Sequence, residues 1–258
     1  LPNVIKVWYY FYMKYSNVIS AEFVSRPNRF IAEVMAGGER VRAHVKNTGR
    51  CAELLVPGAK VYVQDHRDSM GSRKLAYSLI SVEKYLPEGR TIIVNMDSQA
   101  PNRVVKEALE EGRLRLPGLD SLEIIRPESR WGGSRLDFFL RDVQGREAYA
   151  EVKGVNLESE GVALFPDAPT DRGIRHLNEL INIKESGRQA YVIFIIQMAG
   201  IRYLAPNDMR HRAFGDALRN AEAAGVKILA FDCEVQPGEV KIKSPVKTVL
   251  RRNGNGCE

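Results

Sequence analysis

The chain has 258 residues, which is long for one domain and sufficient for two smaller ones. Hydrophobic residues make up 44% and charged residues 27%, and these ordinary values exclude a wholly disordered or fibrous protein. The net charge of +6 favours a polyanionic partner, although many basic proteins never bind nucleic acid. The cysteines are too few and too far apart for a disulfide framework or a zinc cluster, which indicates a reducing compartment: Cys51, Cys233 and Cys257.

The segment 4–15 is rich in aromatic residues but carries Lys6 and Lys14. It is too short to cross a bilayer, which needs about 20 apolar residues, and no small-residue cleavage site of a signal peptide follows it. Its β-branched and aromatic content suits a strand or an appended arm. No other stretch is long and apolar enough to span a membrane, so we expect a cytoplasmic protein.

Short strands separated by turns are predicted between residues 22 and 95. The clearest pair, 30–35 and 40–45, flanks the turn Gly37-Gly38. About five short strands in this length predict a small Greek-key barrel of the oligonucleotide-binding (OB) type, and any other small β-barrel fits the same pattern. The remaining strands are predicted at 60–64, 75–82 and 91–94.

The pattern changes near residue 97, where we place the boundary between two domains. The first, 1–97, is the OB-like barrel with an extra N-terminal segment, 1–20. The second, 98–258, alternates helices with strands and ends in a basic tail, so we expect a mixed sheet flanked by helices and an α+β chain. Helices are predicted from Pro101 to about Gly112, from the N-cap Thr170 to Ser186, and at 211–224; strands are predicted at 122–125, 135–140, 147–152, 190–196 and 226–231.

Two acids and a lysine fall together if the predicted strands 135–140 and 147–152 form a hairpin. Asp137 and Glu151 are then cross-strand neighbours with Cβ atoms about 4.5–5.5 Å apart. Alternation puts Lys153 on the same face as Glu151. Carboxylates this close repel unless a cation lies between them, and Mg²⁺ binds to such groups together with a substrate phosphate. The three residues therefore predict a metal-dependent attack of water on a phosphodiester, in which the acids hold the metal and the lysine orients the water.

The same three residues also fit a solvated hairpin face with ordinary cross-strand ion pairs. A second acid-x-Lys triplet, Glu239-Val240-Lys241, lacks a matching acid across a tight turn. Pro166-Asp167 has the letters of a nuclease motif, but it follows Glu151 in the chain instead of preceding it. We therefore assign it to a loop before the helix.

Six short segments stand out in their order along the chain: Asn28-Arg29-Phe30, Asn47-Thr48-Gly49-Arg50, Pro101-Asn102-Arg103, Gly133-Ser134-Arg135-Leu136-Asp137, Glu151-Val152-Lys153 and Phe165-Pro166-Asp167-Ala168-Pro169-Thr170. Together they resemble the sugar fermentation stimulation protein (SfsA) family, over about residues 22–235. The resemblance implies an N-terminal OB barrel, a C-terminal restriction-endonuclease-like domain of the PD-(D/E)xK type, and DNA binding linked to the regulation of sugar-utilisation genes. It also implies a metal-dependent nuclease activity, with Asp137, Glu151 and Lys153 at the nuclease-like positions. Arg175 departs from the pattern, because a lysine is expected before His176.

A third metal ligand is expected from the first helix. Glu107 faces away from the apolar stripe, and domains of this kind often bring a helix acid to the metal. A solvated helix face beside Lys106 and Glu110 explains Glu107 as well. With Asp137 and Glu151, it completes the ligand set expected for Mg²⁺ or Mn²⁺. His176 is interpreted as a structural histidine in preference to a general base.

Basic and polar residues in both domains are candidates for nucleic-acid contacts. The barrel candidates gather at a strand end and turn, and those of the second domain lie beside the acids and in the first turns of the helix capped by Thr170. A polar loop and ordinary helix capping explain them equally well. The candidates are Arg42, Lys46, Asn47, Arg50, Arg135, Arg172 and Arg175. The basic residues of the tail are expected to form a disordered DNA-contacting arm or a solvated tail: Lys241, Lys243, Lys247, Arg251 and Arg252.

We expect a DNA-binding protein with a Mg²⁺-dependent phosphodiesterase centre. The alternative is a non-catalytic DNA-binding transcriptional regulator that keeps the nuclease fold for binding only, and a scaffold without a nucleic-acid partner is a third candidate. The expected partner is single- or double-stranded DNA, with no membrane contact, and a homodimer is left open. Phosphate-binding loops, dinucleotide-binding glycine patterns and nucleophile elbows are missing, so motors, dehydrogenases and serine hydrolases have no support.

Overall fold

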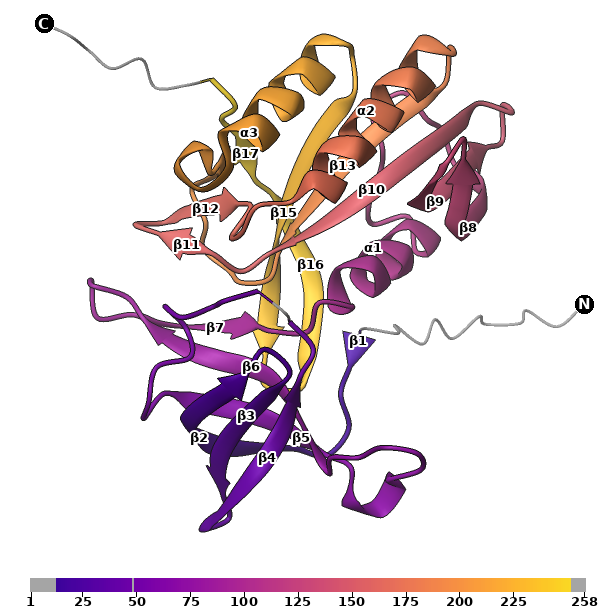
Figure 1. Ribbon diagram of the computed structural model, residues 1–258. Helices are drawn as coiled ribbons and strands as arrows, with labels where there is room; N and C mark the ends of the chain where they lie inside the picture. The colour runs from indigo at the N-terminus through magenta and orange to yellow at the C-terminus, as the bar shows by residue number, and fades with distance from the viewer. Residues whose placement is uncertain (1–12, 48, 252–258) are drawn as a thin grey trace, which may run out of the picture.

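A computed structural model describes residues 13–47 and 49–251 of the chain, and its ribbon has a β-barrel below an α/β layer (Figure 1). Most of the aromatic segment 4–15 and the tail residue Arg252 lie outside these described residues. Within them, no helix has the length and apolar character needed to cross a membrane.

The lower part is a closed barrel of five strands, which confirms the OB-like prediction. Its strands join in the order β4-β3-β2-β5-β6, and parallel pairing of β4 with β6 closes the ring. Gly37 and Gly38, at φ 59° and 85°, turn β3 into β4 in a conformation that glycine adopts without a steric penalty. The elements are β2 (Val18–Asn28), β3 (Ile31–Ala36), β4 (Glu39–Val45), β5 (Lys60–Asp65), η1 (Arg67–Ser69), β6 (Tyr77–Tyr85) and β7 (Thr91–Asn95). β7 pairs with β6 as a sixth strand of this sheet.

The upper part is built on a mixed sheet, as predicted, and this sheet has seven strands. The order is β1-β16-β15-β13-β10-β9-β8, with the three central strands β10, β13 and β15 parallel to one another. The outer pairings are antiparallel. The strands are β1 (Met13–Lys14), β8 (Leu122–Trp131), β9 (Ser134–Asp142), β10 (Glu147–Val155), β13 (Gln189–Ile196), β15 (Lys227–Gln236) and β16 (Glu239–Pro245).

Helices cover both faces of this sheet: α1 (Ala100–Glu110) lies on one, and α2 (Asp171–Glu185) and α3 (Asp208–Ala223) lie on the other. Alternate residues of β13 face opposite sides of the sheet. Tyr191 and Ile193 pack with α1, while Val192 and Phe194 pack with α2 and α3. The continuous apolar run in this strand is therefore buried on both faces, as its sequence predicts.

A second, smaller sheet lies beside the ends of the central strands and was not predicted. Its order is β11-β12-β14-β17. Each strand has only two to four residues, too few to show a periodicity in the sequence. The strands are β11 (Glu158–Ser159), β12 (Val162–Phe165), β14 (Tyr203–Pro206) and β17 (Lys247–Thr248).

The basic tail is largely folded, so the expectation of a disordered arm is wrong for the described part. Lys241 and Lys243 belong to β16, whose Val240 and Ile242 are buried and anchor it to the sheet. Lys247 belongs to β17. At the other end, β1 pairs with β16, so the start of the described chain joins the larger sheet and not the barrel.

Buried side-chain amides connect the barrel to the α/β layer. The Asn156 amide donates to Asn95 O at 2.9 Å and to Gln197 Oε1 at 3.1 Å. The Gln197 amide donates to Asn95 Oδ1 at 2.8 Å and to Asp97 O at 2.9 Å. The Asn47 amide reaches Asn156 Oδ1 at 3.1 Å. The largest apolar cluster also contains side chains of both parts, so they form one packed unit.

Candidate metal and phosphodiester site

The acid pair lies where β9 and β10 separate. Their ladder runs from Arg141 opposite Glu147 to Phe138 opposite Ala150, so the next pair in this register is Asp137 and Glu151. This is the predicted hairpin register. The backbone ladder stops here, and Asp137 Oδ2 accepts the Val152 N–H at 2.7 Å in its place.

Asp137 is fixed from a second side by α1. The Asn102 amide donates to its Oδ1 at 2.8 Å. The sequence pattern predicts Asn102 only at the start of a helix, and its segment Pro101-Asn102-Arg103 stands out by the family resemblance alone. Two hydrogen bonds therefore hold the Asp137 carboxylate, one on each oxygen.

Glu151 is buried, at 4% exposure, and only one of its oxygens is hydrogen-bonded. Lys153 Nζ lies 2.6 Å from Oε1, and His176 Nδ1 of α2 contacts the same oxygen. Oε2 is buried without a hydrogen-bond partner in the described structure. Arg172 Nε donates to His176 Nε2 at 3.4 Å, which agrees with a histidine whose proton is on Nδ1 and points at Glu151. This arrangement suits the structural role expected for His176.

The two carboxyls have opposite pKa shifts. Burial raises the pKa of Asp137, and the negative charge of Glu151 raises it further. Burial acts in the same direction on Glu151, but the hydrogen bonds from His176 and Lys153 outweigh it and lower the pKa of Glu151. Glu151 is thus the carboxylate that stays charged, and a cation beside it would favour the ionised form of Asp137 as well.

The donor set fits a hard divalent cation. A buried carboxylate oxygen without a partner is rare and costly, and a cation would satisfy it. In the described parts of the chain, no three His, Cys, Asp or Glu side chains gather as a metal cage. Two carboxylates with water and substrate phosphate suit Mg²⁺ or Mn²⁺, because Mg²⁺ seldom uses an all-protein cage.

Glu107, the expected third ligand, has other neighbours. Its carboxylate accepts the backbone N–H of Met13, and the charges with the largest effects on its pKa are those of Arg103 and Glu111. Burial raises the pKa of Glu107. The structure brings Asn102 of the same helix, and not Glu107, to the acid pair.

The barrel candidates fall into two groups. Lys46 pairs with the fully buried Asp97 at 2.6 Å, and Asn47 belongs to the buried amide network. Both are therefore engaged at the junction of the two parts. Arg42 and Arg50 are exposed, and Arg42 lies 3.7 Å from the carboxylate of Glu33.

Of the candidates in the α/β layer, Arg172 is connected to Glu151 through His176. Arg135 is exposed on β9, two residues before Asp137 and hence on the same face of the strand, and lies 3.5 Å from Glu128. Arg172 and Arg175 are exposed in the first turns of α2. Thr170 caps this helix as predicted, because its Oγ1 accepts the Gly173 N–H at 3.0 Å.

The barrel turn at Gly49 approaches Asp167 in the loop 165–170 that precedes α2. A Cβ atom on Gly49 would lie 2.1 Å from Asp167 Oδ2 and 2.9 Å from Asn47 Oδ1, so a larger residue here would require these side chains to move. Arg26 holds the turn by donating to three of its carbonyl oxygens. Pro166-Asp167 is thus loop structure before the helix, as expected, and barrel residues lie at the entrance to α2.

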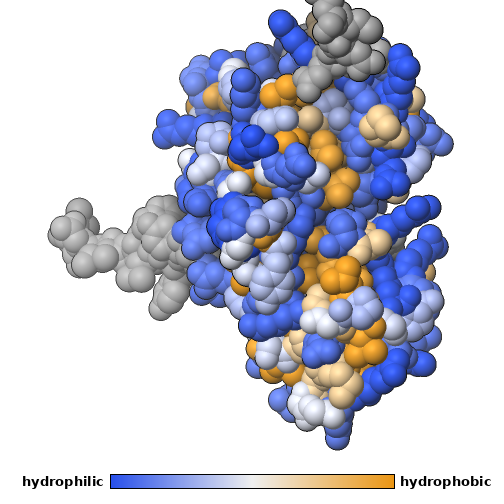
Figure 2. All heavy atoms as spheres, turned by 90° about the vertical axis from the view of Figure 1, so that its left-hand side faces the viewer, coloured by the Kyte–Doolittle hydropathy of each residue, from blue (hydrophilic) through white to orange (hydrophobic). Residues whose placement is uncertain are grey.

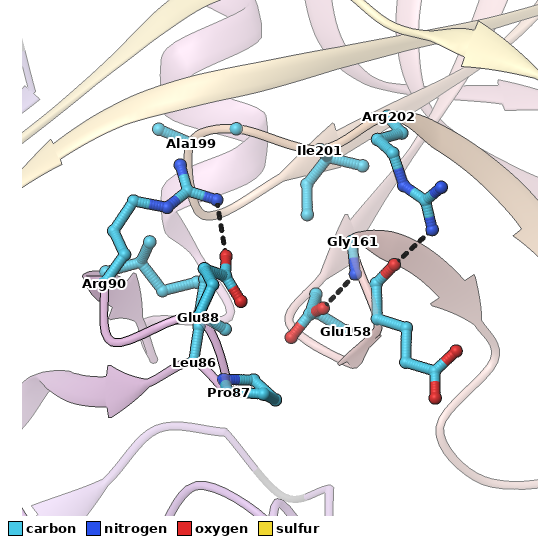
Figure 3. A pocket seen from close by; sticks show the side chains of 12 residues that line it. Leu86, Pro87, Glu88, Arg90, Glu158, Gly161, Ala199, Ile201 and Arg202 are labelled. Atoms are coloured by element: carbon cyan, nitrogen blue, oxygen red, sulfur yellow. Dashed lines mark hydrogen bonds and ion pairs between the residues drawn. The ribbon is translucent and has the colours of Figure 1, made fainter.

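A separate pocket of about 400 Å³ lies where the β6–β7 turn meets the loops of the smaller sheet. The side chains of Arg90 and Arg202 lie at its two sides, with Ile201 between them (Figure 3). Neither acid of the pair lines it. Figure 2 faces this side of the molecule, and hydrophobic residues come to the surface there among hydrophilic ones.

Two family models match the chain. The model described as the SfsA N-terminal OB domain matches residues 24–95, and the sugar fermentation stimulation protein RE domain matches residues 99–239.

Individual relatives agree with these models. A sugar fermentation stimulation protein homolog of Desulfitobacterium hafniense is 51% identical over 229 residues, which cover 89% of this chain and 95% of the relative. A homolog of Ruminiclostridium cellulolyticum is 44% identical, covering 92% and 100%. The solved structure of Pyrococcus furiosus SfsA in complex with Ca²⁺ superposes with a TM-score of 0.80 at 28% identity, covering 93% of this chain and 99% of that one.

Proposed function

Because the chain belongs to the sugar fermentation stimulation protein (SfsA) family, we propose that it binds DNA and hydrolyses phosphodiester bonds at Asp137 and Glu151 with a divalent cation. The observation that carries this proposal is the buried Oε2 of Glu151, which lacks a partner beside a second carboxylate. The Ca²⁺ complex of the Pyrococcus furiosus relative supports it, because Ca²⁺ is also a hard, oxygen-seeking cation.

Each side chain has a role in this chemistry. Asp137 and Glu151 would hold Mg²⁺ or Mn²⁺, which, when bound, stabilises the negative charge that develops on the phosphate. Asn102 and the Val152 N–H keep the Asp137 oxygens oriented. Lys153 lies beside Glu151, where its ammonium can orient the attacking water and offset transition-state charge. Arg135, Arg172 and Arg175 supply contacts to the phosphates on either side.

The test is cleavage of labelled single- and double-stranded DNA and RNA in Mg²⁺ or Mn²⁺. We expect Glu151→Gln and Asp137→Asn each to reduce the rate at least about 100-fold, as loss of a charge-stabilising group does. Glu107→Gln is the matched acid-to-amide control and retains the rate.

Binding of Mn²⁺, followed by its electron paramagnetic resonance signal, gives a second readout without substrate. Wild-type protein should reduce the free-ion signal and Glu151→Gln should not. If wild-type protein binds DNA but cuts none of the substrates in either metal, the nuclease proposal fails. The chain is then a non-catalytic DNA-binding regulator.

A further inference from the structure

An arginine groove lies next to the acid pair on the α2 face of the larger sheet. We define it by Arg126, Arg130, Phe139, Tyr149 and Arg188, and its volume is about 490 Å³. β8 forms its outer wall and is also the edge strand of the sheet. The metal and phosphodiester site described above uses none of these residues.

Strand register places the groove one row from the acids. Tyr149 lies two residues before Glu151 on β10. It lies opposite Phe139, which is two residues after Asp137 on β9. Tyr149 and Glu151 therefore share one face of β10, where His176 of α2 contacts Glu151, and they lie about 6.6 Å apart along the strand. Arg126 lies opposite Phe139 on β8 and extends this row to the sheet edge.

Aromatic rings hold two of the guanidinium groups. The Arg126 guanidinium carbon is 5.3 Å from the centre of the Phe139 ring, and that of Arg188 is 5.0 Å from the Trp131 ring. Phe139 and Trp131 each pack edge-on against Tyr149, with ring centres 5.2 Å apart. The rings are largely covered, and Arg126 is exposed above them.

Glu128 and Glu147 also line the groove, so its three arginines exceed its acids by one charge. Glu147 pairs with Arg188 at 2.7 Å, and Glu128 lies 3.5 Å from Arg135. Arg126 and Arg130 form no ion pair with any described residue. Two guanidinium groups thus stand in an open groove without an anionic partner.

We propose that the arginine groove binds a single nucleic-acid strand, in the segment that flanks the phosphodiester at Asp137 and Glu151. Arg130 contacts a phosphate, and a base stacks on the outer plane of Arg126, since bases of single strands stack on guanidinium planes. This inference rests on the proposed function and deepens it by naming the strand type.

The test compares Arg126→Gln/Arg130→Gln with the control Lys106→Gln/Arg115→Gln, which removes the same charge from the side covered by α1. Fluorescence anisotropy measures the binding of a labelled 12-nucleotide single strand and of the matching duplex, in Ca²⁺, between 50 and 200 mM salt. The groove variant should bind the single strand at least about tenfold more weakly, with a salt slope smaller by about 0.7 for the one phosphate contact of Arg130, while the control changes affinity less than about twofold. Arg126→Lys/Arg130→Lys should recover the salt slope but not the affinity, because an ammonium does not stack flat on a base.

The outcomes separate the inference from the proposed function. Equal weakening by both double variants, or weakening of duplex binding alone, overturns the groove and leaves the nuclease proposal standing. Wild-type protein that neither binds nor cuts any of the nucleic acids overturns both. Thermal melting of each variant shows whether it is folded. If Arg126→Gln/Arg130→Gln melts at a lower temperature than wild type, the loss of affinity in Arg126→Lys/Arg130→Lys, which keeps both charges, tests the groove instead.

Discussion

Glu151 and Asp137 are held by two kinds of contact, those within the β9–β10 hairpin and those from the helices. Alternation on two strands joined by a short turn is enough to place Asp137, Glu151 and Lys153 together, because a hairpin has one register that buries its apolar face. Asn102 and His176 reach the same carboxylates from α1 and α2. Their contacts depend on how helices dock on the sheet, which residue spacing does not encode. The same limit explains why Glu107 was expected at the metal.

Asp142 gives a pH-dependent prediction at the turn of this hairpin. Burial alone would raise its pKa, but the N–H groups of Asp120, Gln144 and Arg146 and the Arg146 guanidinium lower the pKa to about 2. A carboxyl with a lowered pKa stabilises the fold above its ordinary value near 4 and loses this contribution as the pH falls towards 2. Asp142→Asn should therefore lower the urea midpoint at pH 6 and lower it by about half as much at pH 3. An equal loss at both pH values would contradict the ionic role of Asp142.

At the scale of elements, the long periodic segments were predictable and the short or irregular ones were not. α1, α2 and β13 end close to their predicted limits, because a cap, an amphipathic stripe or a continuous apolar run marks each of them. β2 was not singled out, since register shifts near Phe23 and Ser25 interrupt its alternation. β16 was mistaken for a tail because its lysines masked the alternate buried residues Val240 and Ile242.

The N-cap of α2 gives a prediction for an element that carries His176. Thr170→Ala removes the acceptor for the Gly173 N–H and should lower the free energy of unfolding by about 1 kcal/mol. Thr170→Ser keeps the oxygen and should lose less than half of that. Urea unfolding of the three proteins measures both differences, and a serine variant as unstable as the alanine variant would assign the effect to packing of the methyl group.

For the whole molecule, we expect the amide network to couple the unfolding of the barrel to that of the α/β layer. Gln197 is 1% exposed, and its side chain bonds to Asn95, Asp97 and Asn156. Gln197→Ala leaves several of these buried groups unpaired and should cost about 3 kcal/mol. In this variant the backbone amide hydrogens of Asn95 and of position 197 should also exchange faster than in the wild-type protein.

Gln64→Ala is the control for this prediction, because the Gln64 amide bonds to Ser16 at the surface. Its cost should stay below about 0.5 kcal/mol. Equal stability of the two variants would show that apolar packing alone couples the two parts.

The pairing of β1 with β16 also sets an order of events during synthesis. All strands of the barrel sheet have been synthesised once Asn95 has left the ribosome. Met13 cannot pair until Val240, which is almost at the other end of the chain, has been synthesised. Contacts this distant in sequence form late, and domains finished early fold first. The first described strand is therefore among the last to find its partner, and a nascent chain released before β16 would expose the edge of β15.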